Sequence, residues 1–191
     1  MPRVLILDDE SSVTAALHRL LRQRFQKQID VMTFTDPIEA LARVHDTVFD
    51  VVLSDFRMPG MSGLEFLAQT KVTQPYAVRM ILSASYDFDI IQKAVNDVEV
   101  FRYMAKPWDE AELLQQIQNG LDRAEQTRQE RDLADGMRVQ QGVMSTQDLE
   151  RKRLENEEPG LTIVEWGPNG EIIMPDGLLD QGAFTQTKGQ S

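Results

Sequence analysis

The chain has 191 residues, of which 27% are charged, 41% are apolar and none is cysteine. This length and composition suit one domain with an appendage. The absence of cysteine excludes disulfides, thiolate metal sites and cysteine nucleophiles. Its 20 basic and 31 acidic residues give a net charge of −11, and so acidic a surface repels phosphate backbones and argues against nucleic-acid binding. No apolar run reaches the ~18 residues of a membrane span and no signal-like segment precedes the first run, so we expect a cytoplasmic protein without membrane contact.

Short apolar runs occur four times between residues 1 and 122. Each run is apolar on both faces, which is typical of strands in a parallel sheet covered by helices. Each run also ends at a polar residue, where a strand would leave the core. The runs are Val4–Leu7, Val51–Leu53, Met80–Leu82 and Val100–Ala105, and they stop at Asp8, Ser54, Ser83 and Lys106.

Helix-start signals lie between these runs. Asp36 precedes a proline in the first helical position, and Ser62 and Asp109 are each followed three residues later by glutamate, which is the spacing of a capping box. The alternation predicts an α/β fold: a doubly wound (βα)₅ unit with a parallel five-stranded sheet. Ligands of such sheets bind beyond the carboxyl ends of the strands.

The chain changes character after residue 122. We predict a domain over residues 1–122, a helical connector over 123–158, and a small β-hairpin with a flexible tail over 159–191. Gly136 and Gly142 each weaken a continuous helix by ~1 kcal/mol relative to alanine, and a second helix is expected to start near Ser145. Asn169-Gly170 supplies the turn of the predicted hairpin.

Polar side chains with complementary chemistry stand at the predicted strand ends. Asp8 and Asp9 follow the first strand and Asp55 follows the third, and such hard oxygen ligands suit Mg²⁺. Ser83 and Lys106 end the fourth and fifth strands. These groups could move a phosphoryl group onto a carboxylate, with Asp55 as the nucleophile and Lys106 and Ser83 holding the phosphoryl oxygens.

The same residues carry a resemblance to a known family over about residues 2–122. In sequence order and spacing, the chain resembles response regulator receiver domains of two-component systems, which have a flavodoxin-like fold. The matching segments are 4–9, 50–63, 83–84 and 106–108. The resemblance implies that Asp55 accepts a phosphoryl group from a histidine kinase or phosphotransfer protein. It also implies that Asp9, Asp55 and the backbone carbonyl of Arg57 bind Mg²⁺, with Asp8 assisting through water.

Further positions match the family's switch. Ser83 and Tyr103 correspond to its hydroxyl and aromatic switch residues, and the Lys106-Pro107 bond is cis in the family. Residues 101–108 are similar to receivers that precede HD-GYP phosphodiesterases, although no HD or GYP motif follows. The resemblance implies a phosphoacceptor that assists its own phosphorylation and dephosphorylation, not an enzyme with an outside substrate.

One enzymatic alternative shares the aspartate nucleophile and Mg²⁺. Phosphatases and phosphotransferases similar to the haloacid dehalogenases place a second aspartate two residues after the nucleophile as a general acid. Arg57 stands there in this chain, which favours the receiver.

The appendage lacks the features of a DNA-binding output. Residues 122–191 carry eight basic and fourteen acidic side chains and no basic recognition helix. We therefore expect signalling by protein contact, through the face of the fourth helix, fifth strand and fifth helix and through the appendage. The hairpin with Trp166 could pack on its own chain or dock a downstream protein or second protomer. The stripe from Leu114 to Ala124 could be core or could pair with its copy in a homodimer.

Overall fold

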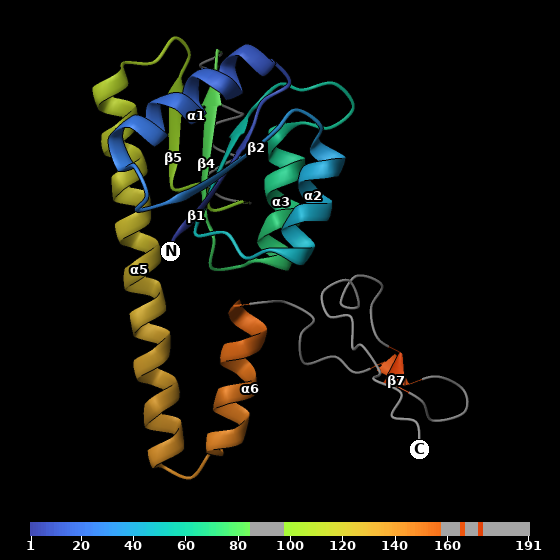
Figure 1. Cartoon of the computed structure of the whole chain (residues 1–191), viewed down its shortest axis with the longest axis vertical. Helices are drawn as coiled ribbons and strands as arrows, with labels where there is room; N and C mark the ends of the chain where they lie inside the picture. The colour runs from blue at the N-terminus through green and yellow to red at the C-terminus, as the bar shows by residue number, and fades with distance from the viewer. Residues whose placement is uncertain (85–97, 158–164, 167–171, 174–191) are drawn as a thin grey trace, which may run out of the picture.

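The computed structural model describes residues 1–84, 98–157, 165–166 and 172–173, and it contains one parallel five-stranded sheet (Figure 1). The strand order is β2-β1-β3-β4-β5, which confirms the doubly wound α/β prediction. The order reverses between β1 and β3, and ligands of such sheets bind at this switch point. The strands are β1 (Arg3–Leu7), β2 (Asp30–Phe34), β3 (Val51–Asp55), β4 (Val78–Ser83) and β5 (Arg102–Ala105).

Helices cover both faces of the sheet (Figure 1). One face packs against α1 and α5, and the other packs against α2 and α3. The predicted fourth helix falls within residues 85–97, outside the described residues. The helices are α1 (Ser11–Phe25), α2 (Pro37–Asp46), α3 (Gly63–Thr73), α5 (Glu110–Gln140) and α6 (Thr146–Glu157).

The burial of each strand explains whether it appears as a continuous apolar run in the sequence. Every residue of β3 and β4 is buried, because helices lie on both of their faces. By contrast, β2 is an edge strand in which only Val31 is buried. Its mixed composition gave no continuous apolar run, so sequence analysis placed four of the five strands individually.

All three predicted helix starts are capped. The Asp36 side chain accepts a hydrogen bond from an amide of the first turn of α2 at 2.8 Å, and Asp109 accepts one in α5 at 2.9 Å. Ser62 and Glu65 form a complete capping box at the start of α3. These caps satisfy N–H groups that lack helical partners, and they start each helix close to the strand end that carries the site.

The last helix of the sheet domain (the domain of residues 1–122) continues into the connector without a break. The 31-residue α5 crosses position 122 and passes through Gly136, so the expected weakness at Gly136 does not interrupt it. The propensity cost of ~1 kcal/mol is offset by contacts outside the helix, from Arg128 to Asp50 and from Asp135 to Lys152. Gly142 has a φ of +71° and lies in the turn that follows. As predicted, α6 then begins near Ser145.

The connector folds back as a helical hairpin. Lys152 Nζ on α6 bonds both carboxylate oxygens of Asp135 on α5, at 2.6 and 2.8 Å. The hydrogen bond from Lys152 lowers the pKa of Asp135. Figure 1 shows α6 running antiparallel to α5, back toward the sheet domain. No helix in the described part of the chain combines the length and apolar content needed to cross a membrane.

Two contacts fix α5 against the amino-terminal edge of the sheet. Arg128 forms an ion pair with Asp50, the residue before β3, at 3.3 Å. The Arg131 guanidinium lies 3.8 Å from the centroid of the Tyr76 ring, close enough for a cation–π interaction. The apolar stripe of α5 from Ile117 to Ala124 packs in the core. The charged residues that follow it on α5, Arg128 and Arg131, contact the sheet domain of their own chain.

The predicted hairpin is present in its paired core. The strands β6 (Glu165–Trp166) and β7 (Ile172–Ile173) are antiparallel, with Trp166 opposite Ile172. The remainder of the predicted hairpin and tail lies outside the described residues.

Candidate functional site

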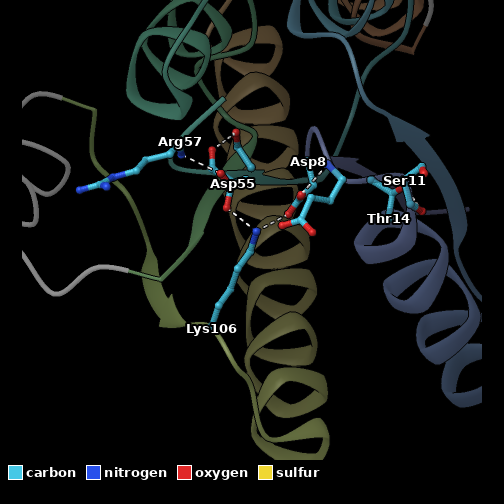
Figure 2. Close-up of polar contacts among 8 residues, drawn as sticks. Asp8, Ser11, Thr14, Asp55, Arg57 and Lys106 are labelled. Atoms are coloured by element: carbon cyan, nitrogen blue, oxygen red, sulfur yellow. Dashed lines mark hydrogen bonds and ion pairs between the residues drawn. The ribbon is translucent and has the colours of Figure 1, made fainter. Parts of the chain in front are cut away.

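A cluster of three charged side chains lies at the carboxyl edge of the sheet, near the point between β1 and β3 where the strand order reverses. Asp8 follows β1, Asp55 ends β3, and Lys106 follows β5. Lys106 Nζ lies 2.6 Å from Asp8 Oδ2 and 2.5 Å from Asp55 Oδ1, and Figure 2 shows the lysine reaching between the two carboxylates. The sequence prediction that these strand ends converge is confirmed for these three residues.

The cluster is buried and carries more negative than positive charge. Asp8 and Asp55 are 1% and 6% exposed, and one ammonium faces both. Burial raises the pKa of the Asp8 carboxyl, and the hydrogen bonds from Lys106 and the Glu10 N–H offset this only in part. Burial alone would lower the pKa of Lys106, but its hydrogen bonds to Asp55 and Asp8 outweigh this effect and raise it. Lys106 is therefore a charged group at neutral pH.

The Asp55 carboxylate is held on both of its oxygens. Oδ1 faces Lys106, and Oδ2 accepts a hydrogen bond from the Arg57 N–H at 2.7 Å (Figure 2). The backbone of the loop after β3 therefore orients the side chain that sequence analysis identified as the nucleophile. A carboxylate fixed in this way needs little rearrangement before it reacts.

The donor chemistry of this cluster suits a small, hard dication. Asp8 and Asp55 offer carboxylate oxygens on adjacent strands, and their charge exceeds that of Lys106. Asp9 lies outside the ion-pair cluster: it is exposed and lines an open cavity of about 350 Å³ beside Asp36 and Pro59. Within the described residues, no three carboxylate or histidine side chains form a ready metal centre. The predicted ligands are thus partly assembled, with Lys106 between two of them.

The two predicted switch residues lie on the neighbouring strands β4 and β5. Ser83 is 2% exposed, and its carbonyl accepts a hydrogen bond from the Lys106 N–H at 2.7 Å. Tyr103 is half-buried and packs against the core on the side of α2 and α3. The Lys106-Pro107 bond is cis, as the family resemblance implies. Ser83 therefore adjoins the charged cluster through the backbone of Lys106.

Two residues that touch the Asp55 backbone carry no role predicted from the sequence. Ser54 Oγ donates a hydrogen bond to the Asp55 carbonyl at 2.8 Å, and Gly63 lies against the same carbonyl. A glycine at the first helical position, directly after the Ser62 cap, was the available signal for Gly63. Nothing in the composition or spacing distinguished Ser54 from an ordinary strand residue.

Comparison with known proteins gives a consistent family match. The family model described as response regulator receiver domain matches residues 4–118. The hydrogenase transcriptional regulatory protein HoxA of Cupriavidus necator is 33% identical over 119 residues, which is 62% of this chain and 24% of HoxA. The DNA-binding transcriptional regulator NtrC of Salmonella typhimurium is 32% identical over 130 residues, which is 68% of this chain and 27% of NtrC.

Solved structures agree with the same match. The signal receiver domain of an HD domain-containing protein from Pseudomonas fluorescens Pf-5 is 29% identical with a TM-score of 0.61. The alignment covers 65% of this chain and 98% of that one. The likeness therefore takes in nearly all of that receiver domain and about two thirds of this chain. The chain spans about a quarter of the length of HoxA and NtrC.

Proposed function

The chain belongs to the response regulator receiver domain family, and we propose that it is a signalling switch phosphorylated on Asp55. Receiver domains are typically phosphoacceptors and not enzymes, and in general they receive phosphate from histidine kinases or phosphotransfer proteins. The observation that carries the assignment to Asp55 is its geometry: a buried carboxylate at a strand end, with Lys106 on one oxygen and the Arg57 N–H on the other.

The proposed reaction is a phosphoryl transfer. A carboxylate oxygen of Asp55 attacks phosphorus, the bond from phosphorus to the donor's leaving group breaks, and an acyl phosphate forms on Asp55. Lys106 then pairs with a phosphoryl oxygen while it remains beside Asp8. The donor supplies the reactive phosphate, so the chain contributes position and charge.

Receiver domains generally bind Mg²⁺ at the phosphorylation site. In this chain Asp9, Asp55 and the backbone carbonyl of Arg57 would hold it, with Asp8 bridged through water. When bound, the ion supplies positive charge that offsets the negative charge of the phosphoryl oxygens. The excess of carboxylates over Lys106 in the cluster supports this assignment.

The direct test is incubation with acetyl phosphate in the presence and absence of Mg²⁺. We expect intact mass spectrometry to show one added phosphoryl group, and only when Mg²⁺ is present. Size-exclusion chromatography of the same samples reports any change of assembly. A chain that takes up no phosphate under these conditions would not be a phosphoacceptor.

The proposed switch connects phosphate to a distal face. Ser83 adjoins Lys106, and Tyr103 lies on the next strand, so the two can respond together to a phosphoryl group on Asp55. The proposed responding face consists of the predicted fourth helix, β5 and α5, of which the described residues contain β5 and α5. Protein partners would distinguish the two states at this face and at the appendage.

Lys106→Ala should leave phosphate uptake detectable but uncouple it from partner binding or assembly. The substitution removes the cation that bonds both Asp8 and Asp55, and breaking a buried pair costs about 3 kcal/mol in free energy of unfolding. Urea denaturation measures the stability, and chromatography with and without acetyl phosphate measures the coupling.

Lys71→Ala provides the control, because Lys71 pairs with Glu99 at the surface and such solvent-screened pairs contribute little to stability. A Lys106→Ala chain whose binding or assembly still responds to phosphorylation would refute this role for Lys106.

We propose that the output is protein contact and not DNA binding. Residues 122–191 carry net negative charge, which opposes approach to a phosphate backbone. Two contacts from α5 to the sheet domain and the Lys152–Asp135 bonds hold the helical hairpin in place. This mounting supports a role in presenting the segment with Trp166 to a downstream protein or a second copy of the chain.

Truncation after Leu121 should yield a chain that still takes up phosphate but loses its partner or dimer. The site residues all precede Leu121, whereas the contacts that hold the α5–α6 helical hairpin follow it. Burial of Trp166 at an interface would contribute about 3 kcal/mol, so Trp166→Ala should weaken association in the full chain. Light scattering and partner pull-down compare the three chains. If they associate identically, the appendage is passive.

A further inference from the structure

The backbone carbonyl of Asp55 is enclosed by two residues that the proposed reaction does not use. Ser54 is fully buried, and its Oγ donates to the Asp55 carbonyl at 2.8 Å. At Gly63, the first residue of α3, an added Cβ would lie 2.0 Å from the same carbonyl oxygen and 3.0 Å from Ser54 Oγ. A side chain therefore cannot occupy position 63 unless the end of β3 moves away from α3.

These contacts lie at both ends of the loop that orients the Asp55 carboxylate. The loop starts at Phe56, whose carbonyl accepts a hydrogen bond from the Gly63 N–H at 2.9 Å. Its second residue, Arg57, donates to Asp55 Oδ2 at 2.7 Å. A rotation of the Asp55 peptide would move the carboxylate and this donor relative to each other. The Ser54 hydroxyl and the bare Gly63 backbone oppose that rotation through their contacts with the Asp55 carbonyl.

We propose that Ser54 and Gly63 are positioning residues for the phosphorylation of Asp55. Ser54 holds the Asp55 carbonyl by its hydrogen bond, and Gly63 sets how closely α3 approaches it. Together they fix the peptide from which the carboxylate projects. This inference rests on the proposed function of Asp55. A misplacement of about 1 Å in a reacting group can slow a reaction by about 100-fold.

The test compares Ser54→Ala with two reference variants. Ser54→Thr retains the hydroxyl, and Thr70→Val removes an equally buried hydroxyl that bonds the Phe66 carbonyl on α3 at 3.0 Å, away from Asp55. The measurements are the rate of phosphate uptake from acetyl phosphate with Mg²⁺, the melting temperature, and the hydrogen-exchange rate of the Arg57 amide. The exchange measurement needs neither donor nor metal.

We expect Ser54→Ala to take up phosphate about tenfold more slowly, with an unchanged acetyl phosphate concentration at half-maximal rate and faster exchange at Arg57. Ser54→Thr should recover most of the rate, and Thr70→Val should change the melting temperature without changing uptake or exchange. Gly63→Ala should slow uptake further, with Gly136→Ala as its control because a Cβ at position 136 meets open space.

The outcomes separate this inference from the proposed function. If the unaltered chain takes up no phosphate, the proposed function fails, and exchange at Arg57 still tests whether Ser54 holds the Asp55 loop. If Ser54→Ala matches the unaltered chain in both exchange and uptake, the inference is wrong. Equal slowing by Ser54→Ala and Thr70→Val would likewise refute it, because the effect would then be general destabilisation. Should Gly63→Ala fail to fold, Ser54→Ala decides.

Discussion

Asp55→Asn should abolish phosphate uptake, lowering the rate by more than about 10³-fold. The amide cannot attack phosphorus as the carboxylate does, and Asp55 presents its carboxylate between Lys106 and the Arg57 N–H at this edge. Because Asp8 still pairs with Lys106 at 2.6 Å, the variant should fold. Intact mass after incubation with acetyl phosphate and Mg²⁺ measures uptake, and release by hydroxylamine identifies an acyl phosphate.

Asp46→Asn is the matched control, since Asp46 is an exposed residue at the end of α2. It should take up phosphate at the rate of the unaltered chain. If Asp55→Asn were labelled at that same rate, phosphate would be attached elsewhere and the assignment of Asp55 would be wrong.

Arg79→Met should lower the free energy of unfolding by about 3 kcal/mol. Arg79 is a buried residue of β4. It donates to the carbonyls of Val98 and Ala77 at 2.8 Å each and to that of Pro75 at 3.2 Å. Methionine retains most of the apolar stem but leaves these acceptors without their donor, and an unsatisfied buried acceptor costs about 1–3 kcal/mol.

Urea denaturation followed by circular dichroism measures this change, and the melting temperature should fall by about 8 °C for a chain of this size. Arg19→Met is the control, because Arg19 is exposed on α1 and surface substitutions change stability by about 0.5 kcal/mol or less. Equal stability of the two variants would mean that the Arg79 hydrogen bonds contribute nothing net.

The sequence predicts most of the fold because the elements that build it carry local signals. The fully buried strands β3 and β4 appear as unbroken apolar runs, and the caps at Asp36, Ser62 and Asp109 mark helix starts. The edge strand β2 lacks such a signal, since Val31 is its only buried residue. The continuity of α5 through Gly136 also could not be predicted from propensity alone, because contacts outside the helix hold it.

The site shows the same division. The meeting of Asp8, Asp55 and Lys106 follows from parallel strands that end at one edge. The placement of Lys106 directly between two carboxylates does not follow from spacing, since it depends on how a long side chain satisfies buried charge. The contacts of Ser54 and Gly63 with the Asp55 carbonyl are set by how closely α3 approaches β3, a tertiary distance that leaves no local pattern.

The reversal of direction between α5 and α6 limits the distance between the sheet domain and a molecule bound after α6. At 1.5 Å per residue, the 12 residues of α6 return the chain by ~18 Å along the axis of α5. The carboxyl end of α6 therefore lies on the side of the sheet domain and not at the distant tip of α5. A short tether raises the effective concentration of a captured molecule at its second contact. A partner with modest affinity for the sheet domain and for the segment after α6 could thus be retained by both contacts together. Lengthening the turn at Gly142 would weaken that retention without altering either contact surface.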